Sequence, residues 1–323
     1  MLLNKIILNL TLFFEALMII LLHLLLTFSI YSQDLKSPSI IILGTVQDAG
    51  SPHIACKKDC CKSLFGSPDS SRKVVSLGLV DPFSNSKFLI EATPDITAQM
   101  KILKSFLPNS MIETPNAIFL THAHIGHYTG LMYLGKEAMS ANLVGVYAMP
   151  KMMTFLETNG PWNQLVTEKN INLIQMETEQ YISLSNYLRI KPILVPHRDE
   201  YSETVGYIIE GPKKKALFIP DIDKWQKWNK NIIEIIKSVD YAFIDATFYS
   251  GTELNNRDIS QIPHPFVIES MELFKDLSKD EKNKIYFIHL NHTNPLLNKE
   301  SQEYKTVIKN GFNVAEYLQV FSL

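Results

Sequence analysis

Three histidines lie within six residues, directly after an apolar run, and their spacing is that of a metal centre. The run is Ala117–Leu120, and His122, His124 and His127 follow it. In an extended segment alternate side chains face the same way, so His122 and His124 can present two imidazoles to one ion. Gly126 permits a tight turn that lets His127 point back toward the same cavity. Imidazole nitrogen binds zinc, iron, copper or nickel, and a catalytic ion needs about three protein ligands and one open position. The pattern therefore predicts a catalytic metal centre, and the competing interpretation is a histidine cluster without a ligand role.

The three cysteines of the chain form a second cluster with metal-binding character. Cys56, Cys60 and Cys61 lie within six residues, and His53 precedes them by three. Three thiolates and one imidazole are a typical ligand set for a closed structural zinc site. Because three cysteines cannot all pair with one another, the alternative in an oxidising compartment is one disulfide, from Cys56 to Cys60 or Cys61, and one free thiol. We expect zinc here, with the disulfide as the alternative.

The elements that must position these residues are predicted by the apolar pattern of residues 38–323, which shows no linker, repeat or change in composition. We expect one domain there, made of two packed sheets with helices outside. The predicted strands are Ser39–Val46, Lys73–Val80, Lys87–Ala92, Ala117–Thr121, Leu143–Ala148, Tyr187–Val195, Thr204–Glu210, Ala216–Ile219, Tyr241–Asp245 and Ile285–Leu290. The predicted helices are Asp95–Phe106, His127–Gly135, Pro150–Glu157, Lys224–Ser238 and Lys299–Lys309.

Residues 1–32 are set apart from this domain by an almost continuous apolar stretch. Lys5 precedes the stretch Ile6–Ile30, and small polar residues up to Ser32 follow it, which is the plan of a secretory signal. An uncleaved membrane anchor is the alternative, although Glu15 and His23 inside the stretch count against it. Either arrangement predicts an exported domain, periplasmic or extracellular, or one anchored outside the cytoplasm.

The charge composition restricts the kinds of molecule that this domain can bind. The 323 residues include 31 Lys and Arg against 33 Asp and Glu, for a formal net charge of -2. Nucleic-acid binding requires clustered basic side chains, so the charge balance argues against it. We expect a small-molecule substrate, and membrane contact only through the N-terminal segment if it is uncleaved. The sequence does not indicate an oligomeric state.

The histidine motif resembles the His-x-His-x-Asp-His signature of the metallo-β-lactamase fold hydrolases, except that Gly126 stands where that family usually carries Asp. The resemblance implies the αββα sandwich of that family, with two packed mixed β-sheets and helices on the outer faces. Pro196-His197, Phe218-Ile219-Pro220-Asp221 and Phe287-Ile288-His289 match the later ligand positions in order. The ligands that the resemblance implies are His122, His124 and His197 for a first ion, His127 and His289 for a second, and Asp221 as a bridge.

Because Gly126 stands where the signature has Asp, the second metal position lacks one negatively charged ligand. We expect weaker metal binding there unless another residue substitutes, and Asp48, Asp95, His264 and His292 are the candidates. A chain that has lost this ligand can also be a catalytically silent metal-binding protein, which is one alternative to an enzyme.

Further segments resemble the pyrroloquinoline quinone biosynthesis protein B family across nearly everything after residue 38. They are Leu43-Gly44-Thr45, Gly50-Ser51-Pro52-His53, Asp245-Ala246-Thr247-Phe248-Tyr249, Ile262-Pro263-His264-Pro265 and Ile288-His289-Leu290-Asn291-His292-Thr293-Asn294-Pro295. This resemblance keeps a second alternative open, an oxidative enzyme that uses iron or copper at the same histidines.

The leading hypothesis is a hydrolase that holds one or two catalytic zinc ions, and possible substrates contain an ester, amide or phosphodiester bond. Asp221 would orient the nucleophile as well as bind metal. His264 or His292 would stabilise developing negative charge or protonate the leaving group. Asp245, at a predicted strand end, would orient a ligand histidine or simply cap the strand.

Overall fold

Alternating apolar residues place each strand between two hydrophobic layers. In β1 (Ser39–Gly44), Ile40 and Ile42 belong to a buried cluster between two sheets, whereas Ile41 and Leu43 belong to a second cluster beneath helices. The pattern follows from the two-residue period of a strand, which sends successive side chains to opposite faces. Because both faces are apolar, the strand must be covered on both sides.

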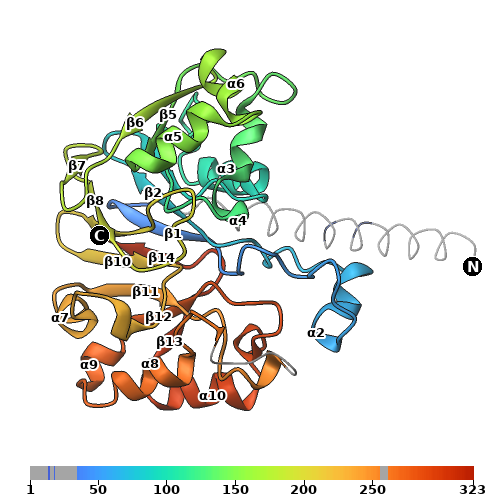
Figure 1. Cartoon of the computed structure of the whole chain (residues 1–323), viewed down its shortest axis with the longest axis vertical. Coiled ribbons are helices and arrows are strands. Elements are labelled where there is room, and N and C mark those ends of the chain that lie inside the picture. Colours follow the sequence, from blue (N-terminus) through green and yellow to red (C-terminus); the bar gives the residue numbers. More distant parts are fainter. Residues whose placement is uncertain (1–13, 15–17, 19–34, 255–260) are drawn as a thin grey trace, which may run out of the picture.

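A computed structural model of the chain describes residues 14, 18, 35–254 and 261–323, and a pair of seven-stranded sheets packs face to face within these residues (Figure 1). In the first sheet, β14, β1, β2 and β3 pair antiparallel, whereas β3 to β6 pair parallel. Its strands, in spatial order, are β14 (Val320–Ser322), β1, β2 (Ser76–Asp81), β3 (Ser86–Ile90), β4 (Ala117–Phe119), β5 (Val144–Ala148) and β6 (Ile171–Gln175).

The second sheet repeats this mixture of strand directions. From β7 to β10 the strands pair antiparallel, and from β10 to β13 they pair parallel. Its strands, in spatial order, are β13 (Asn313–Val314), β12 (Ile285–Ile288), β11 (Tyr241–Asp245), β10 (Lys215–Ile219), β9 (Val205–Glu210), β8 (Arg189–Leu194) and β7 (Ile182–Ser183).

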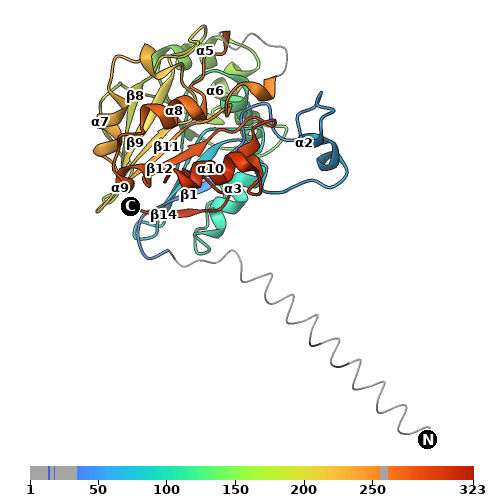
Figure 2. The ribbon, with the colours of Figure 1, turned by 90° about the horizontal axis from the view of Figure 1, so that it is seen from below.

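Helices cover the outer face of each sheet, which completes four layers (Figures 1 and 2). Residues of α3, α5 and α6 share a buried cluster with the first sheet, and residues of α7, α8 and α10 share one with the second. A short helix, α2, stands away from both sheets in the two views. The helices are α2 (Asp59–Lys62), α3 (Ile96–Ser105), α4 (Ile125–Tyr128), α5 (Pro150–Thr158), α6 (Trp162–Thr167), α7 (Ile232–Lys237), α8 (Val267–Leu273), α9 (Lys279–Lys282) and α10 (Gln302–Lys309).

The structure confirms the predicted sandwich and contains a strand at each of the ten predicted positions. Two predicted helices were wrong in extent. The segment 127–135 is α4 followed by a 3₁₀ turn, Thr129–Leu134. The segment 224–238 is interrupted because Trp228 is extended, with ψ 132°, and Asn231 then caps α7 by accepting a hydrogen bond from the Ile233 amide.

The predicted leader, residues 1–32, lies outside the described residues apart from two isolated positions, 14 and 18. Among the helices that the structure describes, none has the length and apolar character needed to cross a bilayer.

Candidate metal centre

The predicted ligands meet because several parallel strands end at one edge of the molecule. Asp221 follows β10, Asp245 ends β11 and His289 follows β12, and these three strands are parallel neighbours. His122 follows β4 of the other sheet. The two sheets are joined at this edge through Val46, which forms bridges with Val74 and Leu290. Ends of parallel strands gather side chains at one edge, so segments distant in sequence converge there.

Four side chains direct one donor atom each to a common point. His124 Nδ1 lies 2.9 Å from His122 Nε2 and 3.2 Å from His197 Nε2. Asp221 Oδ2 lies 3.4 Å from His122 Nε2 and 3.2 Å from His197 Nε2. Ligands at about 2.0–2.1 Å from a tetrahedral zinc ion are about 3.3 Å apart, so these separations match the edges of a zinc coordination shell. The structure therefore brings together the three predicted histidines and the predicted carboxylate of the first metal position.

The ring nitrogens that face away from this point are held by polar neighbours. Thr121 Oγ1 donates a hydrogen bond to the Glu91 carboxylate at 2.5 Å. Its single proton is then engaged, so it accepts a hydrogen bond from His122 Nδ1 at 2.8 Å. His197 Nδ1 lies 3.2 Å from Asp223 Oδ1. A proton held at Nδ1 leaves the Nε2 lone pair of His122 and His197 free for a metal ion.

A second group adjoins the first and consists of Asp48, His127 and His289, with one donor atom of each within 4.8 Å of the others. His127 Nε2 is 4.0 Å from Asp221 Oδ2, so Asp221 lies between the two groups, as expected for a bridge. Both histidines are fully buried, yet His127 Nε2 and His289 Nε2 have no hydrogen-bond partner among the described residues. Unpartnered buried nitrogens are costly, and coordination of a cation would satisfy them. The donor sets of both groups fit metal ions.

Outer contacts also orient this second pair of histidines. His289 Nδ1 lies 2.9 Å from Thr247 Oγ1, which in turn donates to Asp245 Oδ1 at 2.7 Å. His127 Nδ1 lies 3.2 Å from Glu91 Oε1. Asp245 therefore acts on His289 through Thr247, which agrees with the predicted orienting role.

His264 also contacts this centre, through the carboxylates of Asp221 and Asp245. Its Nδ1 is 3.1 Å from Asp221 Oδ1 and 2.9 Å from Asp245 Oδ2. Burial disfavours the charged imidazole, but Asp245 and Asp221 outweigh burial and raise the pKa of His264 well above its usual value. Burial likewise opposes ionisation of Asp245, but the charge of His264 outweighs it and lowers the pKa of Asp245 to about 2. His264, one of the two histidines predicted to have a catalytic role, thus lies beside the predicted bridging carboxylate Asp221.

The two buried histidines of the motif have opposite pKa shifts. Burial and the neighbouring charge of His127 lower the pKa of His122 well below its usual value. Burial disfavours the charged form of His127 as well, but the negative charge of Glu91 outweighs the effect of burial and raises the pKa of His127 to about 9. Neutral imidazole is the metal-binding form, so His122 is ready to bind, whereas His127 must release a proton.

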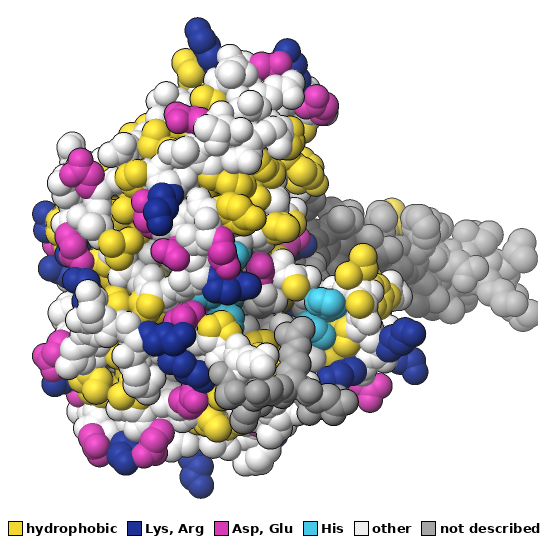
Figure 3. All heavy atoms as spheres, in the orientation of Figure 1, with side chains coloured by type: hydrophobic (Ala, Val, Ile, Leu, Met, Phe, Trp, Pro, Cys, Tyr) yellow, Lys and Arg dark blue, Asp and Glu magenta, His cyan; other side chains and the backbone are white. Residues whose placement is uncertain are grey.

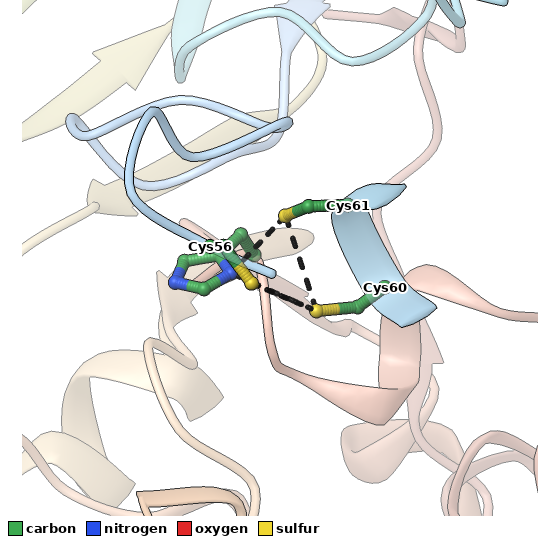
Figure 4. Close-up of side chains that lie close together, drawn as sticks. Cys56, Cys60 and Cys61 are labelled. Carbon is green, nitrogen blue, oxygen red and sulfur yellow. Dashed lines mark hydrogen bonds between the residues drawn. The ribbon is translucent and has the colours of Figure 1, made fainter. Parts of the chain in front are cut away.

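The cysteine cluster differs from the prediction in its fourth member. Cys56 Sγ lies 3.7 Å from Cys60 Sγ, and Cys60 Sγ lies 3.9 Å from Cys61 Sγ (Figure 4). His292 Nδ1 is 3.4 Å from Cys61 Sγ, so His292 completes the donor group. All three cysteines are free thiols, and the alternative of a disulfide is not seen.

His53 was predicted as the fourth ligand, but the structure places His292 in the donor group in its stead, and the His53 ring stacks on His292 at a centroid distance of 4.6 Å. Its Nδ1 accepts from the Ala55 amide at 3.3 Å. The predicted catalytic role of His292 is not supported either, since His292 lies with the cysteines and not with Asp221 and His264.

Cys60 and His292 have pKa values that favour their neutral forms. Burial and the neighbouring thiols raise the pKa of Cys60 to about 12. Burial, His53 and Lys58 lower the pKa of His292 to about 4. A bound cation reverses this preference because it deprotonates a coordinating thiol.

A cavity of about 860 Å³ lies between the two clusters. His264, Thr247 and Asp223 line it on the side of the histidine centre, and Cys56 and His292 line it on the side of the cysteines. Figure 3 shows histidine side chains at two places on this face, one central and one toward the segment that carries α2, with basic side chains nearby.

Glu91 was missed by the sequence analysis, although it touches the centre directly. It follows β3, is fully buried, and has a φ of 77°. His289, which follows β12, has a φ of 66°. Non-glycine residues rarely adopt this conformation, which concentrates at functional sites where surrounding contacts enforce it. The charge of Glu91 within the predicted strand Lys87–Ala92, directly after three apolar residues, is the signal that would have identified it.

A family model described as "Beta-lactamase superfamily domain" matches residues 86–290, which include every donor of the histidine centre except Asp48. The chain belongs to this superfamily. The expected family resemblance is thereby confirmed.

Curated relatives of this superfamily member include coenzyme PQQ synthesis protein B from two bacteria. The protein of Methylorubrum extorquens (strain PA1) is 26% identical over 301 residues, which cover 85% of this chain and 97% of that protein. The protein of Acinetobacter baumannii (strain SDF) is 23% identical over 300 residues, with 85% and 97% covered.

Solved structures confirm the fold. Zn(2+)-bound PqqB from Methylobacterium extorquens matches with a TM-score of 0.71 and 22% identity, covering 88% of this chain and 100% of that chain. A diphosphatase from the PhnP family matches with a TM-score of 0.59 and 20% identity, covering 88% and 96%.

Proposed function

We propose that this superfamily member is a metal-dependent hydrolase with zinc as its metal. The observation that carries the proposal is the convergence of His122 Nε2, His124 Nδ1, His197 Nε2 and Asp221 Oδ2 on one point. A zinc ion there would polarise the bond under attack and lower the pKa of its bound water to about 7. The diphosphatase among the structural neighbours agrees with hydrolytic chemistry on this fold.

The role proposed for His264 is proton donation to the leaving group. Asp221 and Asp245 hold the proton on Nδ1, at 3.1 and 2.9 Å. His264 also lines the cavity, and its Nε2 forms no hydrogen bond among the residues that the structure describes. This nitrogen is therefore free to hydrogen-bond to a substrate. A protonated imidazole facing the cavity can stabilise developing negative charge or donate a proton.

The charges that line the cavity favour an anionic substrate. We therefore favour a phosphodiester over a carboxylic ester or an amide as the bond that is hydrolysed. Arg198, Lys57, Lys58 and Lys227 line the cavity. Lys227 is paired with Asp223 at 2.7 Å, whereas Arg198 and Lys57 form no ion pair among the described residues. Unpaired basic side chains at a cavity wall raise the local concentration of anions and can bind phosphate oxygens.

The experiment is a substrate panel assayed with chelator-treated protein and with the same protein reconstituted with zinc. The panel contains a phosphodiester, a carboxylic ester, a thioester and a lactam. We expect phosphodiester hydrolysis that requires zinc and is lost in His122→Ala. Full activity after complete metal removal, or no hydrolysis of any substrate by reconstituted protein, would contradict the proposal.

An oxidative reaction is the second candidate, because the relatives that match 85% of the chain are coenzyme PQQ synthesis proteins. The same histidines suit iron or copper. Metal analysis of protein purified without added metal, followed by an oxygen-uptake assay, distinguishes the two candidates. Bound iron or copper with oxygen consumption would favour the oxidative reaction over hydrolysis.

We also propose that the protein is exported, on the basis of the apolar stretch Ile6–Ile30 and the polar residues that follow it. Mass measurement of the protein recovered from an extracytoplasmic fraction tests this. A mass that corresponds to cleavage after Ser32 supports a signal peptide, and recovery of the full chain from the cytoplasm contradicts export.

A further inference from the structure

The space beside Gly126 is filled by a segment distant in sequence. A Cβ atom built on Gly126 would lie 1.9 Å from the Asp48 Cβ and 2.5 Å from the Asp48 Cα. Real atoms do not approach so closely, so no side chain fits at position 126 while Asp48 stays in place. The Asp48 side chain therefore begins where the side chain of residue 126 would begin.

Asp48 reaches the donors that a carboxylate at position 126 would serve. One carboxylate oxygen of Asp48, one ring nitrogen of His127 and one ring nitrogen of His289 lie within 4.8 Å of one another. The Nε2 atoms of both histidines are buried and lack a partner among the described residues. Within the same residues, the carboxylate of Asp48 has no hydrogen bond or ion pair of its own, which leaves it available to a cation.

Backbone hydrogen bonds fix Asp48 beside His289. The Gln47 amide donates to the Leu290 carbonyl at 2.9 Å, and the Leu290 amide donates to the Thr45 carbonyl at 2.8 Å. The residues on the amino side of Asp48 are thus paired with the residue after His289. Gly50, with φ 78°, then turns the chain away toward the cysteine cluster. A carboxylate held in this way loses little conformational entropy on binding metal.

We propose that Asp48 is the carboxylate ligand of the second metal position and takes the place of the Asp that the His-x-His-x-Asp-His signature has at the position of Gly126. The ligand comes from the segment after β1 and not from α4. Gly126 is then a requirement of this arrangement, because only glycine admits the Asp48 segment. This inference concerns metal binding, so its test does not depend on whether the proposed hydrolysis is correct.

The first test compares zinc binding by the full chain and by Asp48→Asn, using titration against a competing chelator and elemental analysis. Loss of a ligating charge should weaken binding of the ion at the second histidine position by at least about 100-fold, more than the 10–100-fold typical of outer contacts, with the ions at the first position and at the cysteine cluster unchanged. Asp95→Asn is the matched control. Its carboxylate is also half-buried, but it accepts from the Val74 amide at 2.8 Å and pairs with Lys73 at 3.5 Å.

Substitutions at Gly126 provide the second test. Gly126→Ala and Gly126→Asp should both displace Asp48 and weaken binding of the ion at the second histidine position, even though Asp supplies a new carboxylate. Circular dichroism of the metal-free proteins establishes that each variant is folded. Zinc stoichiometry and affinities in Asp48→Asn equal to those of the wild type would overturn the proposal. An increase in metal binding in Gly126→Asp would also overturn it, because the site would then have lacked its carboxylate.

Discussion

Glu91→Gln should weaken metal binding at the first position of the histidine centre, although Glu91 is not one of the converging donors. Glu91 Oε1 accepts a hydrogen bond from Thr121 Oγ1 at 2.5 Å and lies 3.2 Å from His127 Nδ1. Thr121 in turn holds His122 Nδ1 at 2.8 Å. Glu91 thus holds the protonated nitrogen of His122 through Thr121, and it also lies beside His127 of the second position.

The magnitude follows from the loss of the outer contact that orients His122. Loss of an outer partner of a ligating histidine typically lowers metal affinity 10–100-fold, or about 1.4–2.7 kcal/mol. A glutamine amide can donate to Thr121, which then donates to His122 Nδ1 and moves the proton to Nε2, the nitrogen that must bind metal. At His127 the substitution removes the charge that raises the pKa to about 9, so His127 releases its proton more easily and this contact gives no reason for weaker binding of the second ion. We therefore expect 10–100-fold weaker binding of the ion at the first position.

The assay is competition between the protein and a chromophoric chelator for zinc, at fixed pH and ionic strength. Asp81→Asn is the control, because Asp81 is also fully buried but accepts from the Phe83 amide at 2.9 Å and from Ser84 Oγ at 2.6 Å, within its own turn. It reports the effect of burying an amide in place of a carboxylate. Zinc affinity of Glu91→Gln within about twofold of the wild type, or no lower than that of Asp81→Asn, would refute the reasoning.

Three further predictions follow from the centre and the cavity. In chelator-treated protein, Asp245→Asn should lower the free energy of unfolding by about 2 kcal/mol near pH 6, since the pKa of Asp245 falls from 3.8 to about 2 on folding. A carboxyl group whose pKa is lowered on folding stabilises the folded protein at pH values above its unfolded pKa. Denaturant titrations should therefore show the difference in the free energy of unfolding shrinking between pH 4 and 2, and a constant difference would contradict the assignment. His292→Asn should release one zinc per chain by elemental analysis while His53→Asn retains it, and equal retention by both would be inconsistent with His292 as a ligand. Arg198→Met should raise KM for an anionic substrate about tenfold and leave KM for a neutral analogue unchanged; an equal effect on both substrates would exclude charge recognition.

Local patterns predicted most of the sheet framework because strand periodicity depends on residues close in sequence. The run Ile40–Leu43 is buried on both faces, and its β-branched residues predict a central strand. The strands β6, β7, β13 and β14 were missed. Two of these four contain only two residues and all are at or near the sheet edges, where the apolar pattern is weakest.

The histidine motif was predictable because its chemistry lies within seven residues. The partners that complete it come from distant segments, and no local pattern pairs them. His292 joins cysteines that are 231 and 232 residues away, so the nearby His53 was the wrong choice. Asp48 was one of four candidates to replace the missing ligand, and its packing against Gly126 and its position beside His127 and His289 distinguish it from Asp95.

The central claim is that the histidine centre holds a metal ion, and anomalous diffraction at the zinc edge from crystals of the full chain tests it most directly. We predict a peak about 2.0–2.2 Å from His122 Nε2, His124 Nδ1, His197 Nε2 and Asp221 Oδ2. A zinc peak at the cysteine cluster with none at these four atoms, in crystals grown with excess zinc, would contradict the claim.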